Sequence, residues 1–150
     1  VDGGLGQATP QATHLLKVAC EVATGKRDSI KVFGTDYDTP DGTCIRDYIH
    51  VDDLANAHVV GLRHLIDGGQ GGVFNCGYGR GLSVQEVLDS VAEVSGVQFS
   101  REISGRRAGD PPELIADSSK IREQLGWKPK YNDTELICRT AFEWEQKYQA

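Results

Sequence analysis

Residues 73–91 constrain the fold most, because they read as a buried strand, a glycine-rich loop and a helix in direct succession. Val73-Phe74-Asn75-Cys76 is a short, mostly apolar run of the kind found in buried strands. Ser83 is followed three residues later by Glu86, the capping-box spacing that opens a helix. The apolar series of that helix is Val84, Val87, Leu88 and Val91. A strand that leads into a helix through a glycine loop is the repeating unit of α/β proteins, so we predict an α/β fold.

The rest of the chain alternates between helical and extended patterns in the same way. Start signals and apolar spacing predict further helices over about 10–24 after Thr9-Pro10, over 53–66 after an Asp52 N-cap, over about 118–125, and from Asp133 onward. Strands are predicted at 30–33 and at 97–103. The prolines at 111 and 112 make residues 106–112 a loop. We find no internal repeat and no linker, so 150 residues indicate one domain.

Composition excludes several classes of protein. The net charge of −6, from 16 basic and 22 acidic residues, argues against nucleic-acid binding, which needs a broadly basic face. No stretch approaches the ~20 apolar residues that cross a bilayer, so we expect no membrane association. The four cysteines form no C-x-x-C pair. Reduced thiols and a cytoplasmic location are therefore the simplest expectation.

Two motifs leave alternatives open. The loop Gly77-Tyr78-Gly79-Arg80-Gly81 could present amides to a phosphate, but Leu82 stands where a dinucleotide motif needs glycine, so a tight turn is favoured. The histidines lack the spacing of a metal site, and we predict none. Arg106, Arg107 and Asp110 share one loop, where they are equally consistent with anion binding and with solvated surface charge.

The run from Phe33 to Ala55 resembles the signature segment of UDP-glucose 4-epimerases. It contains the Arg-Asp-Tyr-x-x-Val-x-Asp core at 46–53, which other nucleotide-sugar enzymes of the extended short-chain dehydrogenase/reductase group share. It also contains the Thr-Asp-Tyr-x-Thr-Pro-Asp-Gly-Thr insertion at 35–43, which points to the 4-epimerases. Further similar segments lie at 74–77, 83–87, 106–111 and 125–129, so the resemblance covers nearly the whole chain.

The resemblance implies that residues 1–150 are the C-terminal, UDP-sugar-binding half of an extended short-chain dehydrogenase/reductase. Some of its segments would then pack on a Rossmann domain that is absent from this chain. That domain would bind NAD and supply a Tyr-x-x-x-Lys pair, which we do not find here, so no catalytic residue is assigned and the chain alone is expected to be inactive. The start at Val1, within a glycine-rich stretch, is what we expect of an excised piece. The full enzyme is expected to be a homodimer.

The implied activity is an isomerase that interconverts UDP-glucose and UDP-galactose through NAD-mediated transient oxidation at C4 of the hexose. By resemblance, Arg46 and Arg107 bind the diphosphate, Asp110 binds the ribose and Leu114 lies beside the hexose. The substrate-binding residues implied are His14, Leu15, Lys31, Val32, Phe33, Arg46, Arg107, Ala108, Gly109, Asp110 and Leu114. The alternatives are a non-catalytic nucleotide-sugar-binding fragment, or a 4-epimerase that acts on a UDP-pentose or a UDP-N-acetylhexosamine.

Overall fold

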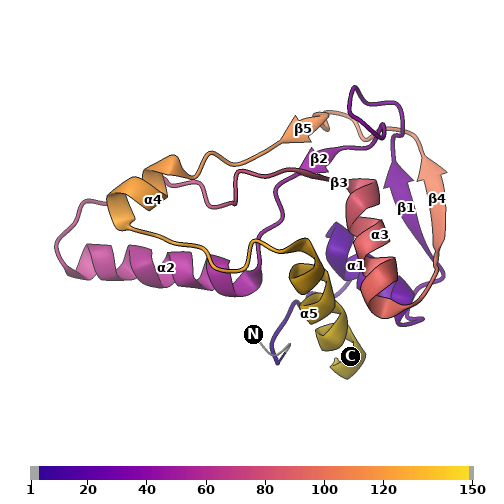
Figure 1. The fold of residues 1–150 in the computed structure, drawn as a ribbon, viewed down its shortest axis with the longest axis horizontal. Helices are drawn as coiled ribbons and strands as arrows, with labels where there is room; N and C mark the ends of the chain where they lie inside the picture. The colour runs from indigo at the N-terminus through magenta and orange to yellow at the C-terminus, as the bar shows by residue number, and fades with distance from the viewer. Residues whose placement is uncertain (1–3, 149–150) are drawn as a thin grey trace.

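The structure of the chain, a computed structural model, describes residues 4–148. Its helices are α1 (Leu15–Ala23), α2 (Val51–Ile66), α3 (Val84–Ser95), α4 (Ser119–Leu125) and α5 (Thr134–Lys147). Its strands are β1 (Ser29–Phe33), β2 (Ile45–Arg46), β3 (Leu82–Ser83), β4 (Ser100–Ser104) and β5 (Glu113–Leu114). Helices and strands are interspersed along the chain, and two of the strand pairs are parallel, which confirms the α/β class (Figure 1).

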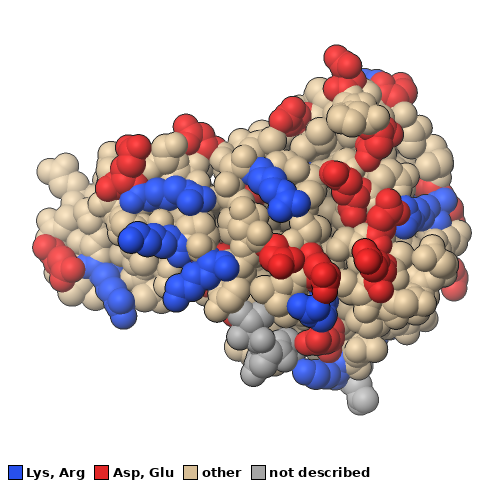
Figure 2. Space-filling view, viewed as in Figure 1, with Lys and Arg blue, Asp and Glu red and all other residues tan. Residues whose placement is uncertain are grey.

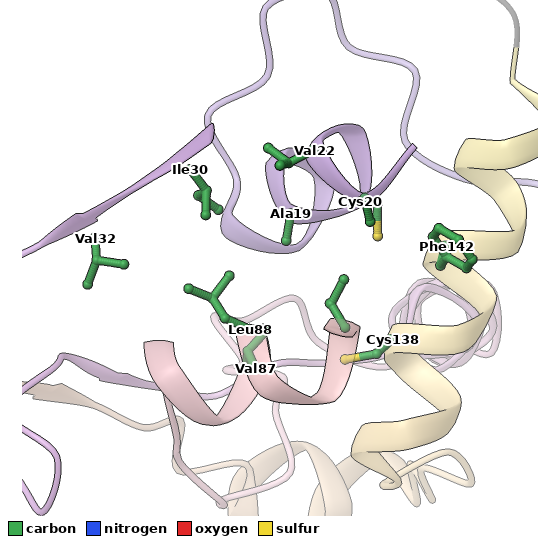
Figure 3. Close-up of a cluster of buried hydrophobic side chains, with 11 residues drawn as sticks. Ala19, Cys20, Val22, Ile30, Val32, Val87, Leu88, Cys138 and Phe142 are labelled. Carbon is green, nitrogen blue, oxygen red and sulfur yellow. The ribbon is translucent and has the colours of Figure 1, made fainter. Parts of the chain in front are cut away.

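The main hydrophobic core lies between β1 and the helices α1, α3 and α5 (Figure 3). Strand β1 pairs with β4 in parallel, from Ser29 opposite Ser100 to Phe33 opposite Ser104. Because side chains alternate along a strand, Ile30 and Val32 both enter the core. The helices contribute Ala19, Cys20, Val22, Ala23, Val87, Leu88, Val91, Cys138 and Phe142. The apolar series in the sequence therefore mark the buried faces of these helices.

A second sheet of three short strands lies between the two ends of the molecule (Figure 1). Its central strand, β2, is antiparallel to β3 and parallel to β5. The amide of Ile45 also donates to the carbonyl of Pro112 at 2.8 Å. These bonds bring residues 110–114 beside residues 45 and 46, although more than sixty positions separate them in the sequence.

Helices α2 and α4 form the other end of the molecule around a smaller core of Ala57, Ile121 and Trp127. The indole N–H of Trp127 donates to the carbonyl of Asp53 at 3.2 Å. The rest of the α2 surface carries exposed apolar side chains, namely Val51, Leu54, Val59, Leu62, Leu65 and Ile66. A helix with apolar residues on most of its surface is normally buried on more than one side. Residues 4–148 cover only one side of α2.

Local signals in the sequence correctly identify several helix ends. The Ser83 hydroxyl accepts from the Glu86 amide at 3.0 Å and the Glu86 carboxylate accepts from the Ser83 amide at 2.7 Å, which confirms the capping box. Asp133 caps α5 by accepting from the Leu136 amide at 3.1 Å. Helix α3 ends at Gly96, whose φ of 68° suits a residue without a side chain.

The predicted start of the first helix is wrong. Helix α1 begins at Leu15, with His14 in the N-cap position, rather than near Pro10. Gln11 has a φ of 52°, in the left-handed region. A residue in that conformation cannot belong to a right-handed helix, so the helix can begin only after it.

The predicted N-cap of α2 is also wrong, because His50 takes the position expected for Asp52. The Nδ1 atom of His50 accepts from the Asp52 amide at 3.1 Å. The carboxylate of Asp53, in the same turn, accepts from the Tyr78 hydroxyl at 2.7 Å and from the amides of Lys130 and Tyr131, both at 2.8 Å. Asp53 thereby links the start of α2 to two distant loops.

Residues 73–76 form no strand in the described structure, so this prediction is wrong for the chain as it stands. Val73 is 84% exposed. A strand needs a neighbouring strand to bond its backbone groups, and no segment within residues 4–148 pairs with residues 73–76. The strand predicted at 97–103 exists, but it begins at Ser100.

Charged side chains are distributed unevenly over the face shown in Figure 2. Lysine and arginine gather over the end formed by α2 and α4, whereas aspartate and glutamate are more frequent over the opposite end. All four cysteines are free thiols, three of them buried. None of the helices described is both long and apolar enough to cross a membrane.

Candidate functional site

A cavity of about 500 Å³ lies between α1, β1, β2 and the loop that follows β4. Six of the residues implied as substrate contacts line it, namely Leu15, Lys31, Phe33, Arg46, Arg107 and Asp110. They come from four separate segments of the chain. The fold therefore gathers into one cavity most of the charged and aromatic residues that the resemblance singles out.

Arg46 and Asp110 form the polar centre of this cavity. Because β2 pairs with β5, the loop before β5 passes beside Arg46, whose guanidinium donates to the Asp110 carboxylate and, at 2.8 Å, to the carbonyl of Pro111. The second Asp110 oxygen lies 3.8 Å from the Cys44 sulfur. Both charged side chains are about a quarter exposed, at 23% and 29%. A cation and a hydrogen-bond acceptor are thus fixed side by side and remain open to a ligand.

Arg107 is a second cation on the rim of the cavity. Its guanidinium carbon lies 3.9 Å from the centre of the Phe33 ring, a cation–π contact. Within residues 4–148 it forms no ion pair. A planar guanidinium with its donors available suits a phosphate better than any other protein cation does.

Arg106, the residue directly before Arg107, does not line the cavity. Its Nε atom donates to the Asp36 carboxylate at 2.8 Å, and its guanidinium lies 4.3 Å from the centre of the Tyr37 ring. The structure therefore separates the two arginines that composition alone could not distinguish.

Five of the implied substrate residues do not line this cavity. Val32 is 1% exposed and packs in the hydrophobic core. His14 lies beside a different, mainly apolar cavity, where its Nδ1 atom is 2.7 Å from the side-chain amide nitrogen of Gln7. The remaining three, Ala108, Gly109 and Leu114, lie on the exposed surface.

Sequence reasoning missed three chemically active residues of the cavity, namely Arg27, Cys44 and Tyr48. Burial raises the pKa of Tyr48 to about 12, so its hydroxyl stays protonated and can donate at neutral pH. The sequence contained a pattern that could have identified Cys44 and Tyr48. Cys44, Arg46 and Tyr48 follow one another at every second position, and such residues share a face in an extended segment.

The glycine-rich loop after residue 76 bends at Gly77 and Gly79 and packs against Asp47. The amides of Tyr78 and Gly79 donate to the two oxygens of Asp47, at 3.0 and 2.9 Å. A side chain at Gly77 would lie 2.5 Å from one of these oxygens. The glycine therefore permits a close backbone approach to Asp47, and these amides are not free for a phosphate. Among the residues described, no three His, Cys, Asp or Glu side chains converge as metal ligands.

The chain is similar to known proteins over nearly its whole length. Residues 4–77 match the NAD dependent epimerase/dehydratase family. Over 98% of its length the chain is 57% identical to a UDP-glucose 4-epimerase from Azospirillum brasilense, of which it covers 42%, and 45% identical to one from Halalkalibacterium halodurans, of which it covers 44%.

Solved structures give the same result. The UDP-Glc/GlcNAc 4-epimerase of Campylobacter jejuni matches 99% of this chain with a TM-score of 0.82 and 55% identity. The UDP-glucose 4-epimerase of Brucella ovis, solved in complex with NAD, matches 97% with a TM-score of 0.91 and 45% identity. The chain covers 45% of each of these structures, and thus spans less than half the length of the relatives it matches. The chain is thus similar to the NAD-dependent epimerase/dehydratase family over residues 4–77, and to UDP-glucose 4-epimerases over nearly its whole length.

Proposed function

We propose that this chain is the C-terminal, UDP-sugar-binding part of an isomerase that interconverts UDP-glucose and UDP-galactose. The observation that carries the proposal is the cavity in which Arg46, Arg107 and Asp110 lie near Phe33. Two guanidinium groups suit a diphosphate, and a carboxylate suits the hydroxyls of a ribose. The identity to 4-epimerases over nearly the whole chain supports the same assignment.

In the proposed reaction, bound NAD would supply the transient oxidation at C4 of the hexose. The glycine loop of this chain does not fit a dinucleotide, because Asp47 occupies its amides. We therefore assign NAD and the catalytic tyrosine and lysine to segments outside this chain. The residues of the cavity have the other task, which is to hold the UDP group while the hexose stays free to turn.

A wider substrate range is a second candidate. The Campylobacter jejuni relative, at 55% identity, is a UDP-Glc/GlcNAc 4-epimerase. Leu114, implied to lie beside the hexose, is 61% exposed, so the described part of the chain does not enclose that position. Activity on UDP-N-acetylglucosamine, weaker than on UDP-glucose, is therefore part of the proposal.

The cavity can be tested with two arginine variants of the longer protein that carries this chain. We expect Arg46→Ala and Arg107→Ala each to weaken UDP binding by about 1.5–3 kcal/mol, the scale of a hydrogen bond to a charged group. The amount of bound NAD should not change. Isothermal titration with UDP gives the affinity. Arg139→Ala is the control, because the one ion-pair partner of Arg139 within residues 4–148 is Glu135, on an exposed helix face. Unchanged affinity in both variants would refute the diphosphate assignment.

The class of function is tested by assaying conversion of UDP-galactose. We expect turnover by the longer protein and none by the 150-residue chain alone. If the longer protein bound UDP but showed no turnover, a non-catalytic nucleotide-sugar-binding protein would be the correct description.

A further inference from the structure

Two consecutive arginines in the loop that follows β4 contact different residues at and after the end of β1. Arg107 lies over Phe33 on the rim of the cavity, whereas Arg106 turns to the segment after β1. There, Arg106 Nε donates to the Asp36 carboxylate at 2.8 Å, and a second guanidinium nitrogen donates to the Asp36 backbone carbonyl. Arg106 is thus held at two points of one residue.

The aromatic ring of Tyr37 forms a third contact with Arg106. The guanidinium carbon lies 4.3 Å from the ring centre, and Tyr37 is itself 6% exposed. Gly34, with a φ of 81°, completes the packing. A side chain there would lie 2.5 Å from the Tyr37 ring and 2.9 Å from Arg106 Cγ. Arg106 therefore has one well-defined position against the segment after β1.

The ion pair itself adds little to the stability of the fold. The Arg106 and Asp36 side chains are 48% and 73% exposed, and exposed ion pairs contribute at most about 1 kcal/mol. The ion pair instead fixes the position of the loop that follows β4. The amide of Gly34 donates to the carbonyl of Ser104 at 2.9 Å, which is the last backbone hydrogen bond between the segments of β1 and β4. The contacts of Arg106 follow directly after this bond.

Arg107 is the next residue after Arg106. On its other side, the amide of Asp110 donates to the Arg107 carbonyl at 3.3 Å, and Asp110 is bound to Arg46. The loop that carries Arg107 is therefore anchored at both ends, by Arg106 before it and by Asp110 after it.

We propose that Arg106 is a positioning residue, which holds the loop on Asp36 and Tyr37 so that Arg107 stacks on Phe33 and faces the cavity. This inference rests on the proposed function, in which Arg107 binds the diphosphate of a UDP-sugar. Arg106 acts through Arg107 and does not touch the ligand.

The decisive variant is Asp36→Ala in the longer protein. It removes a negative charge near the cavity, so a purely electrostatic role for this region predicts equal or tighter UDP binding. Loss of positioning predicts the reverse. We expect UDP affinity to fall about threefold to tenfold, and the KM for the UDP-sugar to rise with kcat unchanged, since only uniform binding is lost. Equal or tighter binding would overturn the proposal.

A double variant tests whether Arg106 acts through Arg107. Arg106→Ala should weaken UDP binding about tenfold in the parent and have no further effect when Arg107→Ala is already present. Arg106→Lys, which keeps the charge and one donor, should restore part of the loss. Independent, multiplicative losses for the two alanine variants would contradict the proposal. Arg139→Ala serves again as the matched control.

Hydrogen–deuterium exchange separates this proposal from the proposed function, because it needs no ligand. Asp36→Ala and Arg106→Ala should accelerate exchange of the Asp110 amide, which donates to the Arg107 carbonyl at 3.3 Å, at least several-fold without a change in melting temperature. If the parent failed to bind UDP, the proposed function would fail while the anchoring of the loop could still be measured. Unchanged exchange of the Asp110 amide in both variants would refute the anchoring itself.

Discussion

At the scale of single residues, Arg46 and Asp110 form an ion pair inside the cavity. The pair is partly exposed, so it contributes little to folding, but it fixes the direction of both groups. A phosphate that binds Arg46 needs no large rearrangement, since a guanidinium has five N–H donors and those used by Ile45, Asp110 and Pro111 leave others available. The pair therefore lowers the ordering cost of binding.

The position of Leu114 leads to a prediction about which UDP-sugars the longer protein accepts. Leu114→Tyr should reduce activity on UDP-N-acetylglucosamine relative to UDP-glucose, because a larger ring takes the space of the N-acetyl group. A difference of this size in a pocket is worth about 1–3 kcal/mol. The measurement is kcat/KM for both sugars in parent and variant. Equal use of the N-acetyl sugar by both proteins would show that Leu114 does not control its entry.

His50 sets a prediction on stability and pH. It is 4% exposed, and its Nδ1 atom accepts from the Asp52 amide, so the ring is neutral with its proton on Nε2, 3.1 Å from the Thr140 hydroxyl. Burial lowers the pKa of His50 below its usual 6.5, against the opposing charges of Asp52 and Asp53. The unfolded chain therefore binds more protons just below pH 6.5, and stability should be full above that pH and fall below it.

The free energy of unfolding at pH ~7.5 and ~5.5 measures this effect. His50→Asn, which can cap a helix but does not titrate, should lose less stability between these two values than the parent does. His58→Asn is the control, because His58 is on the exposed surface. An equal loss in parent and His50→Asn would contradict the prediction.

At the scale of elements, a buried ion pair joins the two helices at the ends of the described chain. Lys17 on α1, 7% exposed, donates to the carboxylate of Glu145 on α5, which is 1% exposed. Lys26 donates to the other Glu145 oxygen at 2.6 Å. The first described residues are held by the same helix, since the Trp144 indole donates to the Gln7 carbonyl at 3.0 Å. Helix α5 thus fixes the orientation of α1, whose first residue, Leu15, lines the cavity.

Removing one partner of this pair should be strongly destabilising. We expect Glu145→Ala to lower the free energy of unfolding by about 3 kcal/mol, because it removes the nearer counter-charge of the buried Lys17 and leaves it with Glu21, whose carboxylate lies 3.4 Å away. The double variant Lys17→Met/Glu145→Leu should recover most of that loss, since both charges are gone and apolar volume remains. Denaturant titration measures both. Additive losses in the double variant would show that the two side chains are not coupled.

At the scale of the whole molecule, the two ends are covered to different degrees. The end with α1, α3 and α5 has a closed core, whereas α2 leaves a row of apolar side chains exposed, with Leu62 at 60% and Ile66 at 74%. Val73, at 84%, adds to the apolar surface of this end. Apolar patches of this kind are typical of interaction surfaces. In the proposed enzyme the Rossmann domain would cover this face.

The isolated 150-residue chain should therefore self-associate. Leu62→Lys/Leu65→Glu should shift it toward monomer, because charges on the α2 face oppose burial. The matched control is Ile103→Lys, which changes an equally exposed apolar residue on β4 at the other end. Sedimentation velocity at several concentrations distinguishes these outcomes. A parent chain that remained monomeric at all concentrations would argue against an uncovered interface.

The sequence by itself determined the features that depend on neighbouring residues. The capping box at Ser83 and Glu86, the Asp133 cap and the glycine end at Gly96 are formed by groups within a few positions of one another, so local spacing was enough to identify them. The α/β class followed from the same local alternation. The family resemblance also identified six residues that line one cavity.

Tertiary structure alone decided the features that depend on distant partners. Residues 73–76 have a strand-like composition but no neighbouring strand within residues 4–148, and backbone groups cannot form a sheet alone. Arg106 and Arg107 have the same chemistry, and only the positions of Asp36 and Phe33, about 70 residues away, give them different partners. Asp47 likewise occupies the glycine-loop amides from 31 and 32 residues away. Pairings across such separations depend on the folded path of the chain, which local residue patterns do not encode.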